Sequence, residues 1–231
     1  MSNKLSSIKV ESPLQYFHRR TSHQSQVGAV NGTELFNGRE LFNGTELFNG
    51  DAEFALVVKE APICTHLNLR GDGRDDGFSA GVSEVLGIPL PTEPGHYHCN
   101  HENSLYWLGP DEWMLVSQAG ALTLEAALRQ RLTGHISIVD LSGGQTLINM
   151  RGSNTAVQTV LKKSSVYDFA GWPSAQTDKG CCVQTTFAKA TAVVSNKSDG
   201  SFDLIIRRSF ADYIARWLLD AGQEFGCRIE G

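Results

Sequence analysis

The pattern of apolar positions divides the chain near residue 53. Before that point apolar residues occur in short islands, and the stretch up to Asn31 shows no sustained helical or strand periodicity. From Phe54 onward, short apolar and alternating runs follow one another at the spacing of strands and helices in a packed domain. The pattern predicts an extended N-terminal arm over residues 1–52 and one folded body over residues 53–231.

Two successive β-α-β-β-α-β units are predicted within the body. The first comprises strands over 54–59, 63–69, 105–108, 113–117 and 136–140, with helices over 78–86 and around Leu124, Leu128 and Leu132. The second comprises strands over 145–150, 183–189, 191–196 and 202–206, with helices over 154–163 and from Ser209 onward. We expect an α+β fold in which two ferredoxin-like halves pack as one body around a large shared core.

Helix signals are clearest at the C-terminal end. Ser209 and Asp212 have the spacing of a capping box, and Thr123 is a candidate N-cap for the helix around Leu124. The last helix carries a regular apolar stripe. Its members are Phe210, Ile214, Trp217, Leu218, Ala221 and Phe225.

A six-residue repeat lies between the arm and the body. Asn-Gly-Thr-Glu-Leu-Phe and close variants of it follow one another over residues 31–54. Because six is not a multiple of the helical period, the leucines would not form a stripe on a helix, and in a strand each Asn-Gly invites a turn. We expect a flexible linker, with an interaction segment ordered by a partner as the alternative.

Composition favours a globular, soluble protein. The chain has 231 residues, of which 41% are hydrophobic, and 20 Lys plus Arg face 25 Asp plus Glu for a net charge of −5. That balance gives no field to hold a polyanion, so we expect no nucleic acid as partner. No apolar run reaches the length of a signal peptide or membrane span, which predicts a cytoplasmic protein without a membrane partner.

The cysteines and histidines are candidate site residues. The five cysteines are an odd number without framework spacing, so we expect no disulfide; they are Cys64, Cys99, Cys181, Cys182 and Cys227. A cluster of His96, His98, Cys99 and His101 contains groups that bind zinc. Because no second Cys/His pair lies nearby, we interpret it as a structural or solvent-exposed loop, with a metal site as the alternative.

Other chemistry finds little support. The chain has no Gly-x-Ser-x-Gly elbow, and its glycine turns lack the pattern that cradles phosphates. Asp140 and Asp168 end apolar segments, where a capping or turn role is the more common one. We therefore predict no catalytic, cofactor-binding or metal residue in this chain.

One motif carries a family resemblance. Residues 107–116 read Trp-Leu-Gly-Pro-Asp-Glu-Trp-Met-Leu-Val, which resembles the most recognisable motif of the gamma subunit of heterotetrameric sarcosine oxidase. Its marker positions are Trp107, Gly109, Pro110, Asp111, Glu112 and Trp113, followed downstream by Arg208, Ser209 and Phe210. Ser12-Pro13-Leu14 also looks like the family's N-terminal signature. The similarity covers most of residues 53–226.

The resemblance implies a fold and a role. The fold is similar to the N-terminal folate-binding fold of the glycine-cleavage T protein. In such complexes alpha and beta subunits hold FAD, FMN, NAD and tetrahydrofolate, and a delta subunit carries zinc. The complex oxidatively demethylates sarcosine to glycine and produces hydrogen peroxide and 5,10-methylenetetrahydrofolate. The gamma subunit is not known for a cofactor of its own, so the resemblance implies a non-catalytic chain.

Two further expectations follow from the resemblance. The arm would contact a neighbouring subunit, with Pro13, Leu14, Tyr16 and Phe17 as candidates. Two alternatives to a sarcosine oxidase gamma subunit remain. One is the equivalent subunit of a complex that oxidises dimethylglycine or another N-methyl amine, and the other is a stand-alone folate-dependent protein related to iron–sulfur repair. The hallmark of that last group begins like residues 179–184 of this chain and then diverges.

Overall fold

The structure is a computed structural model that describes residues 12–15, 35–36, 39–40 and 55–230. Within them, eleven strands hydrogen-bond in one continuous order, β13-β3-β9-β12-β11-β10-β5-β6-β7-β4-β8. These strands are β3 (Leu56–Glu60), β4 (Thr65–Arg70), β5 (His96–Cys99), β6 (Asn103–Gly109), β7 (Glu112–Ser117), β8 (Ser137–Asp140), β9 (Gln145–Gly152), β10 (Lys179–Phe187), β11 (Ala190–Asn196), β12 (Phe202–Arg207) and β13 (Cys227–Glu230). The α-helices are α2 (Asp76–Leu86), α3 (Ala121–Arg131), α4 (Asn154–Ser164) and α5 (Ala211–Ala221).

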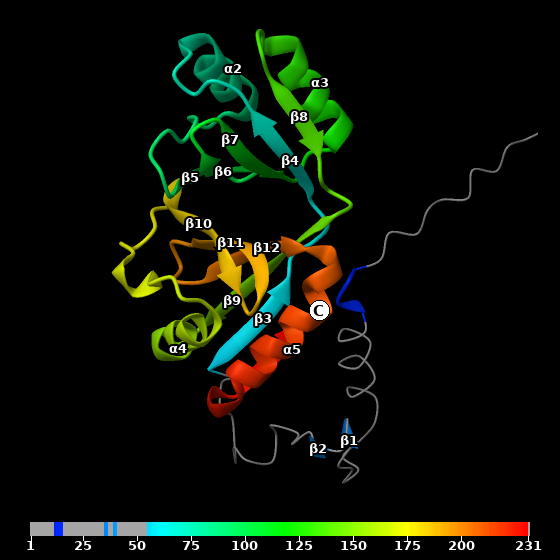
Figure 1. The fold of residues 1–231 in the computed structure, drawn as a ribbon, viewed down its shortest axis with the longest axis vertical. Helices are drawn as coiled ribbons and strands as arrows, with labels where there is room; N and C mark the ends of the chain where they lie inside the picture. The colour runs from blue at the N-terminus through cyan, green and yellow to red at the C-terminus, as the bar shows by residue number, and fades with distance from the viewer. Residues whose placement is uncertain (1–11, 16–34, 37–38, 41–54, 231) are drawn as a thin grey trace, which may run out of the picture.

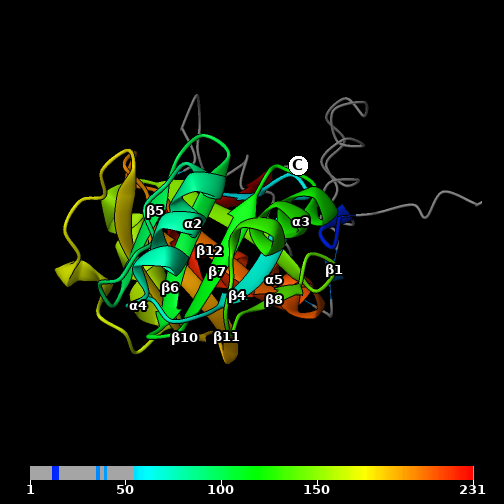
Figure 2. The same cartoon turned by 90° about the horizontal axis from the view of Figure 1, so that it is seen from above.

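The strands and helices form two lobes (Figure 1). The upper lobe contains β4 to β8 with α2 and α3, and Figure 2 shows these two helices over one face of its strands. The lower lobe contains β3, β9 and β11 to β13 with α4 and α5. Strand β10 joins the lobes, because Lys179, Gly180 and Cys181 pair with β5 and the residues from Cys182 onward pair with β11.

This topology confirms the α+β class but not the two ferredoxin-like βαββαβ halves. The first predicted strand, β3, does not join the upper lobe. It pairs antiparallel with β9 and parallel with β13, because Leu56 and Val58 are buried in the lower core. Strands β5 and β13 have no counterpart among the predicted elements.

Most predicted helices and strands are found within a few residues of their expected places. Helix α4 begins after Ser153, whose side chain accepts a hydrogen bond from the backbone N–H of Ala156. Helix α2 begins after Asp75, which caps it in the same way, and ends at Gly87 with φ 67°. Local capping chemistry therefore sets these bounds.

The strand predicted over 183–189 ends earlier, at Phe187. Ala188 and Lys189 have φ of 46° and 70°, so the chain turns there into β11. Two non-glycine residues in the left-handed region are uncommon in a hairpin turn. The turn is held from outside by hydrogen bonds from the Ala188 N–H to the Ser164 carbonyl and from the Tyr213 hydroxyl to the Ala188 carbonyl.

Two predicted caps are wrong. Helix α3 already begins at Ala121, so Thr123 lies inside it. No capping box forms at Ser209, because the 3₁₀ turn η2 (Arg208–Phe210) precedes α5 and no side chain caps that helix. The turn also moves Phe210 out of the buried stripe, since its side chain is 41% exposed.

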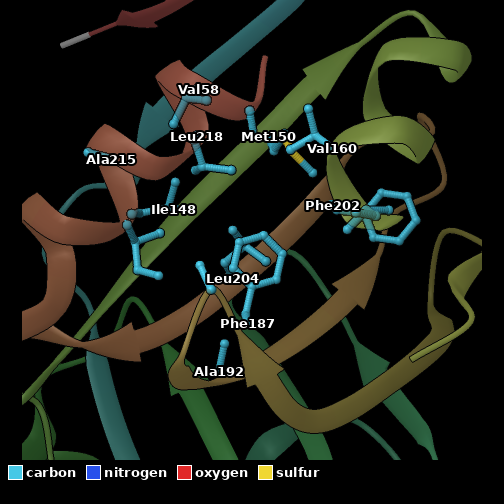
Figure 3. Close-up of a cluster of buried hydrophobic side chains, with 14 of the residues drawn as sticks. Val58, Ile148, Met150, Val160, Phe187, Ala192, Phe202, Leu204, Ala215 and Leu218 are labelled. Carbon is cyan, nitrogen blue, oxygen red and sulfur yellow. The ribbon is translucent and has the colours of Figure 1, made fainter. Parts of the chain in front are cut away.

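Three apolar clusters hold the body together. The largest lies between the lower sheet, α4 and α5, where Met150, Phe187 and Leu218 meet (Figure 3). The second packs the upper strands against α2 and α3. The third lies where strands of the two lobes face one another, and its buried members are Tyr97, Tyr106, Met114, Val116, Cys182, Val193 and Ile205.

Part of the arm is docked on the chain's own lower lobe. The Leu14 side chain is fully buried in the largest cluster. The Ser12 hydroxyl donates to the carboxylate of Glu60, which also accepts a hydrogen bond of 2.8 Å from Thr146. Leu14 was a candidate partner contact, and its burial in this chain corrects that expectation.

The other N-terminal predictions are largely outside the described residues. Pro13 is partly buried, whereas Tyr16 and Phe17 are not described. Within the repeat, β1 (Leu35–Phe36) and β2 (Arg39–Glu40) form a short antiparallel pair. In the sequence, Asn37-Gly38 lies between these two strands, and Asn-Gly is a dipeptide typical of tight hairpin turns. The choice between a linker and an interaction segment, like the boundary at residue 52, stays a prediction.

Removal of the Leu14 side chain is expected to destabilise the body. Leu14→Ala should lower the free energy of unfolding by about 2–5 kcal/mol, since it leaves a cavity in the largest core. Urea unfolding of the isolated chain measures this, with Leu122→Ala as control because Leu122 is 83% exposed. An unchanged unfolding midpoint for Leu14→Ala would show that the segment does not dock there.

Candidate functional site

The motif that carries the family resemblance forms the β6–β7 hairpin. Trp107 pairs with Trp113 across the strands, and a bulge between Trp107 and Gly109 lets Pro110 and Asp111 turn the chain. The bulge adds a residue on one strand and redirects the side chains at the tip. The hairpin therefore brings two indoles and an exposed carboxylate to one end of the upper lobe.

Trp113 is a core residue. Its side chain is 1% exposed, and its indole N–H donates to the carbonyl of Pro91 at 2.8 Å. Its ring lies 5.7 Å from the Phe78 ring, centroid to centroid. A Cβ at Gly73 would stand only 3.1 Å from the indole, so the loop after β4 packs closely on the ring.

Glu112 joins the hairpin to β4. One carboxylate oxygen accepts a hydrogen bond from Asn68 and the other from Arg70, both at 2.7 Å. The backbone N–H of Gly71 adds a bond of 3.2 Å to the Asp111 carbonyl. The acidic marker residue Glu112 thus has a structural role, and Asp111 contributes its backbone to the same junction.

A pocket of about 790 Å³ lies beside the hairpin tip. Trp107 and Trp113 line it from the hairpin, and the loop after β4 and the segments before β5 and β8 complete it. The remaining lining residues are Arg70, Gly71, Asp72, Gly73, Arg74, Thr92, Pro94, Pro110, Asp111, His135 and Ser137. The sequence motif and the pocket coincide, which makes this the candidate binding site of the chain.

The histidine-rich segment is a strand, β5, and the loop interpretation is wrong. The ring nitrogens of His96 and His98 lie 3.1 and 3.0 Å from the carbonyls of Pro94 and Pro89. The Cys99 thiol contacts the Thr177 carbonyl at 3.5 Å. His101 follows the strand and is exposed.

The metal alternative gains no support from this geometry. Among the described residues, no three His, Cys, Asp or Glu side chains are grouped as a metal site would need. His96 and His98 instead line a pocket of about 330 Å³ together with Lys179 and Cys181 of β10. These four face each other across the strand pair that joins the lobes.

All five cysteines are free, as expected. Burial raises the pKa of each thiol, and it raises the pKa of Cys182 and of Cys227 to about 12. The thiolate is the nucleophilic form, so these thiols are poorly suited to attack a substrate at neutral pH.

A polar network crosses the interface between the lobes. The Lys197 ammonium forms an ion pair of 3.1 Å with Asp203 and lies 5.1 Å from the centre of the Tyr97 ring. The Tyr97 hydroxyl donates to the Asn196 carbonyl at 2.7 Å, and burial raises the pKa of Tyr106 to about 12. No motif or spacing indicated this network, because its members come from four strands.

The two aspartates considered as cleft carboxylates have local roles, as predicted. Asp140 accepts a hydrogen bond from the Ser142 hydroxyl, which lowers the pKa of Asp140. Asp168 caps a 3₁₀ turn at the Ala170 N–H. Of the downstream markers, Arg208 donates its backbone N–H to Gly144, and Phe210 is exposed, so neither reaches the hairpin pocket.

Comparison with known protein families shows to which family this chain belongs. The model of the sarcosine oxidase, gamma subunit family matches residues 70–224, which is more than half of the chain. This chain belongs to the sarcosine oxidase gamma subunit family. The match spans the hairpin, the joining strand β10 and most of both lobes.

Similar proteins agree with membership of this gamma subunit family. Sarcosine oxidase subunit gamma of Corynebacterium sp. strain P-1 is 29% identical over 170 residues, which cover 73% of this chain and 80% of that protein. The protein of the same name from strain U-96 is 27% identical over 177 residues, covering 75% and 82%.

Solved structures show the same fold. A chain of the heterotetrameric sarcosine oxidase from Corynebacterium sp. U-96, in complex with pyrrole 2-carboxylate, aligns with a TM-score of 0.70 at 22% identity, covering 94% of this chain and 96% of that one. The glycine cleavage system aminomethyltransferase T from Bartonella henselae aligns with a TM-score of 0.50 at 17% identity, covering 77% and 48%. The gamma subunit family fold thus resembles the fold of the T protein.

No helix in the described part of the chain has the length and apolar character to cross a membrane.

Trp113→Phe tests the structural role of the hairpin indole. The substitution leaves the buried Pro91 carbonyl without its donor and opens space beside Gly73, so unfolding should become easier by roughly 1–3 kcal/mol. Chemical denaturation measures the change. Trp107→Phe is the control, because no described residue accepts a hydrogen bond from the Trp107 indole. Equal stability of Trp113→Phe and the wild type would contradict the buried hydrogen bond.

Stability should also depend on His66. Its side chain is 1% exposed, and burial lowers its pKa below the ordinary 6.5 despite the nearby Cys64 carbonyl and Asp140. The unfolded chain therefore binds more protons than the folded chain. The contribution of neutral, buried His66 to folding stability is complete above about pH 6.5 and declines as pH falls. His66→Gln should reduce the decline in the free energy of unfolding between about pH 7 and about pH 5.5. His101→Gln should leave that decline unchanged. An identical slope in His66→Gln would refute this assignment.

Proposed function

We propose that this chain is the non-catalytic gamma subunit of a heterotetrameric sarcosine oxidase. The observation that carries the proposal is the family match over residues 70–224. Two curated relatives that align over most of their length bear the name of that subunit. The partners would be the alpha, beta and delta subunits.

The complex would oxidise sarcosine to an imine, pass the electrons through flavins to oxygen and form hydrogen peroxide. Tetrahydrofolate would capture the one-carbon unit as 5,10-methylenetetrahydrofolate, and glycine would be released. In this proposal FAD, FMN, NAD, tetrahydrofolate and zinc are bound by other subunits. The complex would work in the cytoplasm, a setting that suits five free thiols.

The geometry of the chain supports a structural role. The reactive-looking side chains take part in packing and in strand-to-strand bonds: Glu112 joins two strands, Trp113 is a core residue, and Asp140 stabilises a turn. The residues that resemble the iron–sulfur-related protein lie in β10, where Cys182 donates its thiol hydrogen to the His96 carbonyl. That contact supports β10 as the link between lobes. A complex that oxidises dimethylglycine instead would differ in a substrate pocket that lies in another chain.

Reconstitution tests the proposal. Alpha, beta and delta subunits produced with this chain should yield a flavin-bearing complex that releases hydrogen peroxide when sarcosine is added. Omission of this chain should reduce the yield of assembled complex, since a permanent subunit covers apolar surface that otherwise stays exposed. The same peroxide measurement with dimethylglycine in place of sarcosine shows which amine the complex oxidises. Assembly and peroxide production at full level without the chain would contradict the proposal.

A further inference from the structure

The hairpin pocket contains polar groups that the fold does not use. The Asp111 carboxylate is exposed, and no described residue donates a hydrogen bond to it. The indole N–H of Trp107 also has no acceptor among the described residues. Its neighbours differ, because Glu112 uses both carboxylate oxygens and Trp113 uses its N–H within the fold. Asp111 and Trp107 are therefore available to a ligand.

The charges around the pocket leave one carboxylate uncompensated. Arg70 faces Glu112 at 2.7 Å, and Arg74 faces Asp72 at 3.1 Å. Each of these pairs is electrically balanced. Asp111 has no cationic partner among the described residues, so the fixed charges of the pocket favour a cation over an anion.

The pocket also offers the surface that a cation prefers. Trp107 is half-buried at the wall and borders the same space as Asp111. An indole face attracts ammonium and guanidinium groups, and a guanidinium can lie on an aromatic ring while it donates hydrogen bonds to a carboxylate. Pro94 and Pro110 add rigid apolar surface to the same pocket.

We propose that this pocket receives an arginine or lysine side chain from an extended segment of a partner subunit. The proposal rests on the proposed function, which supplies the partner. The volume of about 790 Å³ exceeds one side chain, so the neighbouring residues of the segment also fit. The basic side chain reaches Asp111, and its stem packs on Trp107. Aromatic residues at such positions commonly dominate the binding energy.

Charge variants of Asp111 test the site. Tagged chain is titrated with a subcomplex of alpha, beta and delta subunits, and the dissociation constant is measured at low and high salt. Asp111→Asn should weaken binding about tenfold and Asp111→Lys about a hundredfold, with a smaller salt dependence for Asp111→Asn. Asp220→Asn is the matched control, because Asp220 is exposed on α5, away from the pocket. It should bind as the wild type does.

The outcomes separate this site from the proposed function. Asp111→Asn and Asp111→Lys should unfold at the wild-type urea concentration, which shows that any lost affinity is not lost folding. Wild-type affinity in Asp111→Lys, with the wild-type chain bound to the subcomplex, overturns the pocket alone. A wild-type chain that does not bind the subcomplex contradicts the proposed function, and it also overturns the proposal that a partner subunit occupies this pocket.

Discussion

The strand β10 is the constraint on which the rest of the structure depends. One continuous strand pairs with β5 of the upper lobe and with β11 of the lower lobe. The change of partner occurs between Cys181 and Cys182. A Cβ at Gly180 would stand 2.7 to 2.8 Å from atoms of Tyr97, Ala175 and Asn196, so only glycine fits there. Side chains from both lobes therefore pack directly on the backbone of β10 at Gly180.

Asn196 fixes this junction from the lower lobe. Its side chain accepts a hydrogen bond from the Cys181 N–H and donates one to the Pro173 carbonyl, and its backbone carbonyl accepts the Tyr97 hydroxyl. Only 6% of the Asn196 surface is exposed. Buried polar groups that are fully bonded make a junction specific as well as stable. The hairpin pocket is carried by the upper lobe, and its position relative to the lower lobe depends on this junction.

Local patterns predicted the elements better than they predicted the topology. The apolar stripe of α5 is encoded within a few residues, so that helix could be predicted from sequence, whereas the caps at Asp75 and Ser153 are not among the predicted ones. The placement of β3 in the lower lobe depends on where Leu56 and Val58 are buried, which is a long-range contact. The same holds for the docking of Leu14, because the intervening residues give no sign of it. The hairpin motif located the candidate site, but the segments from before β5 and before β8 that complete the pocket became visible only in the fold.

We propose that the chain is a permanent subunit whose side chains mainly stabilise its own fold and, at one pocket, bind a neighbouring subunit. Native mass spectrometry of the material that co-purifies with the tagged chain from its own cells tests this claim most directly. We expect a complex with one copy of this chain and one each of three other subunits, with flavin retained on those subunits. A lone chain, or one bound only to itself, would contradict it.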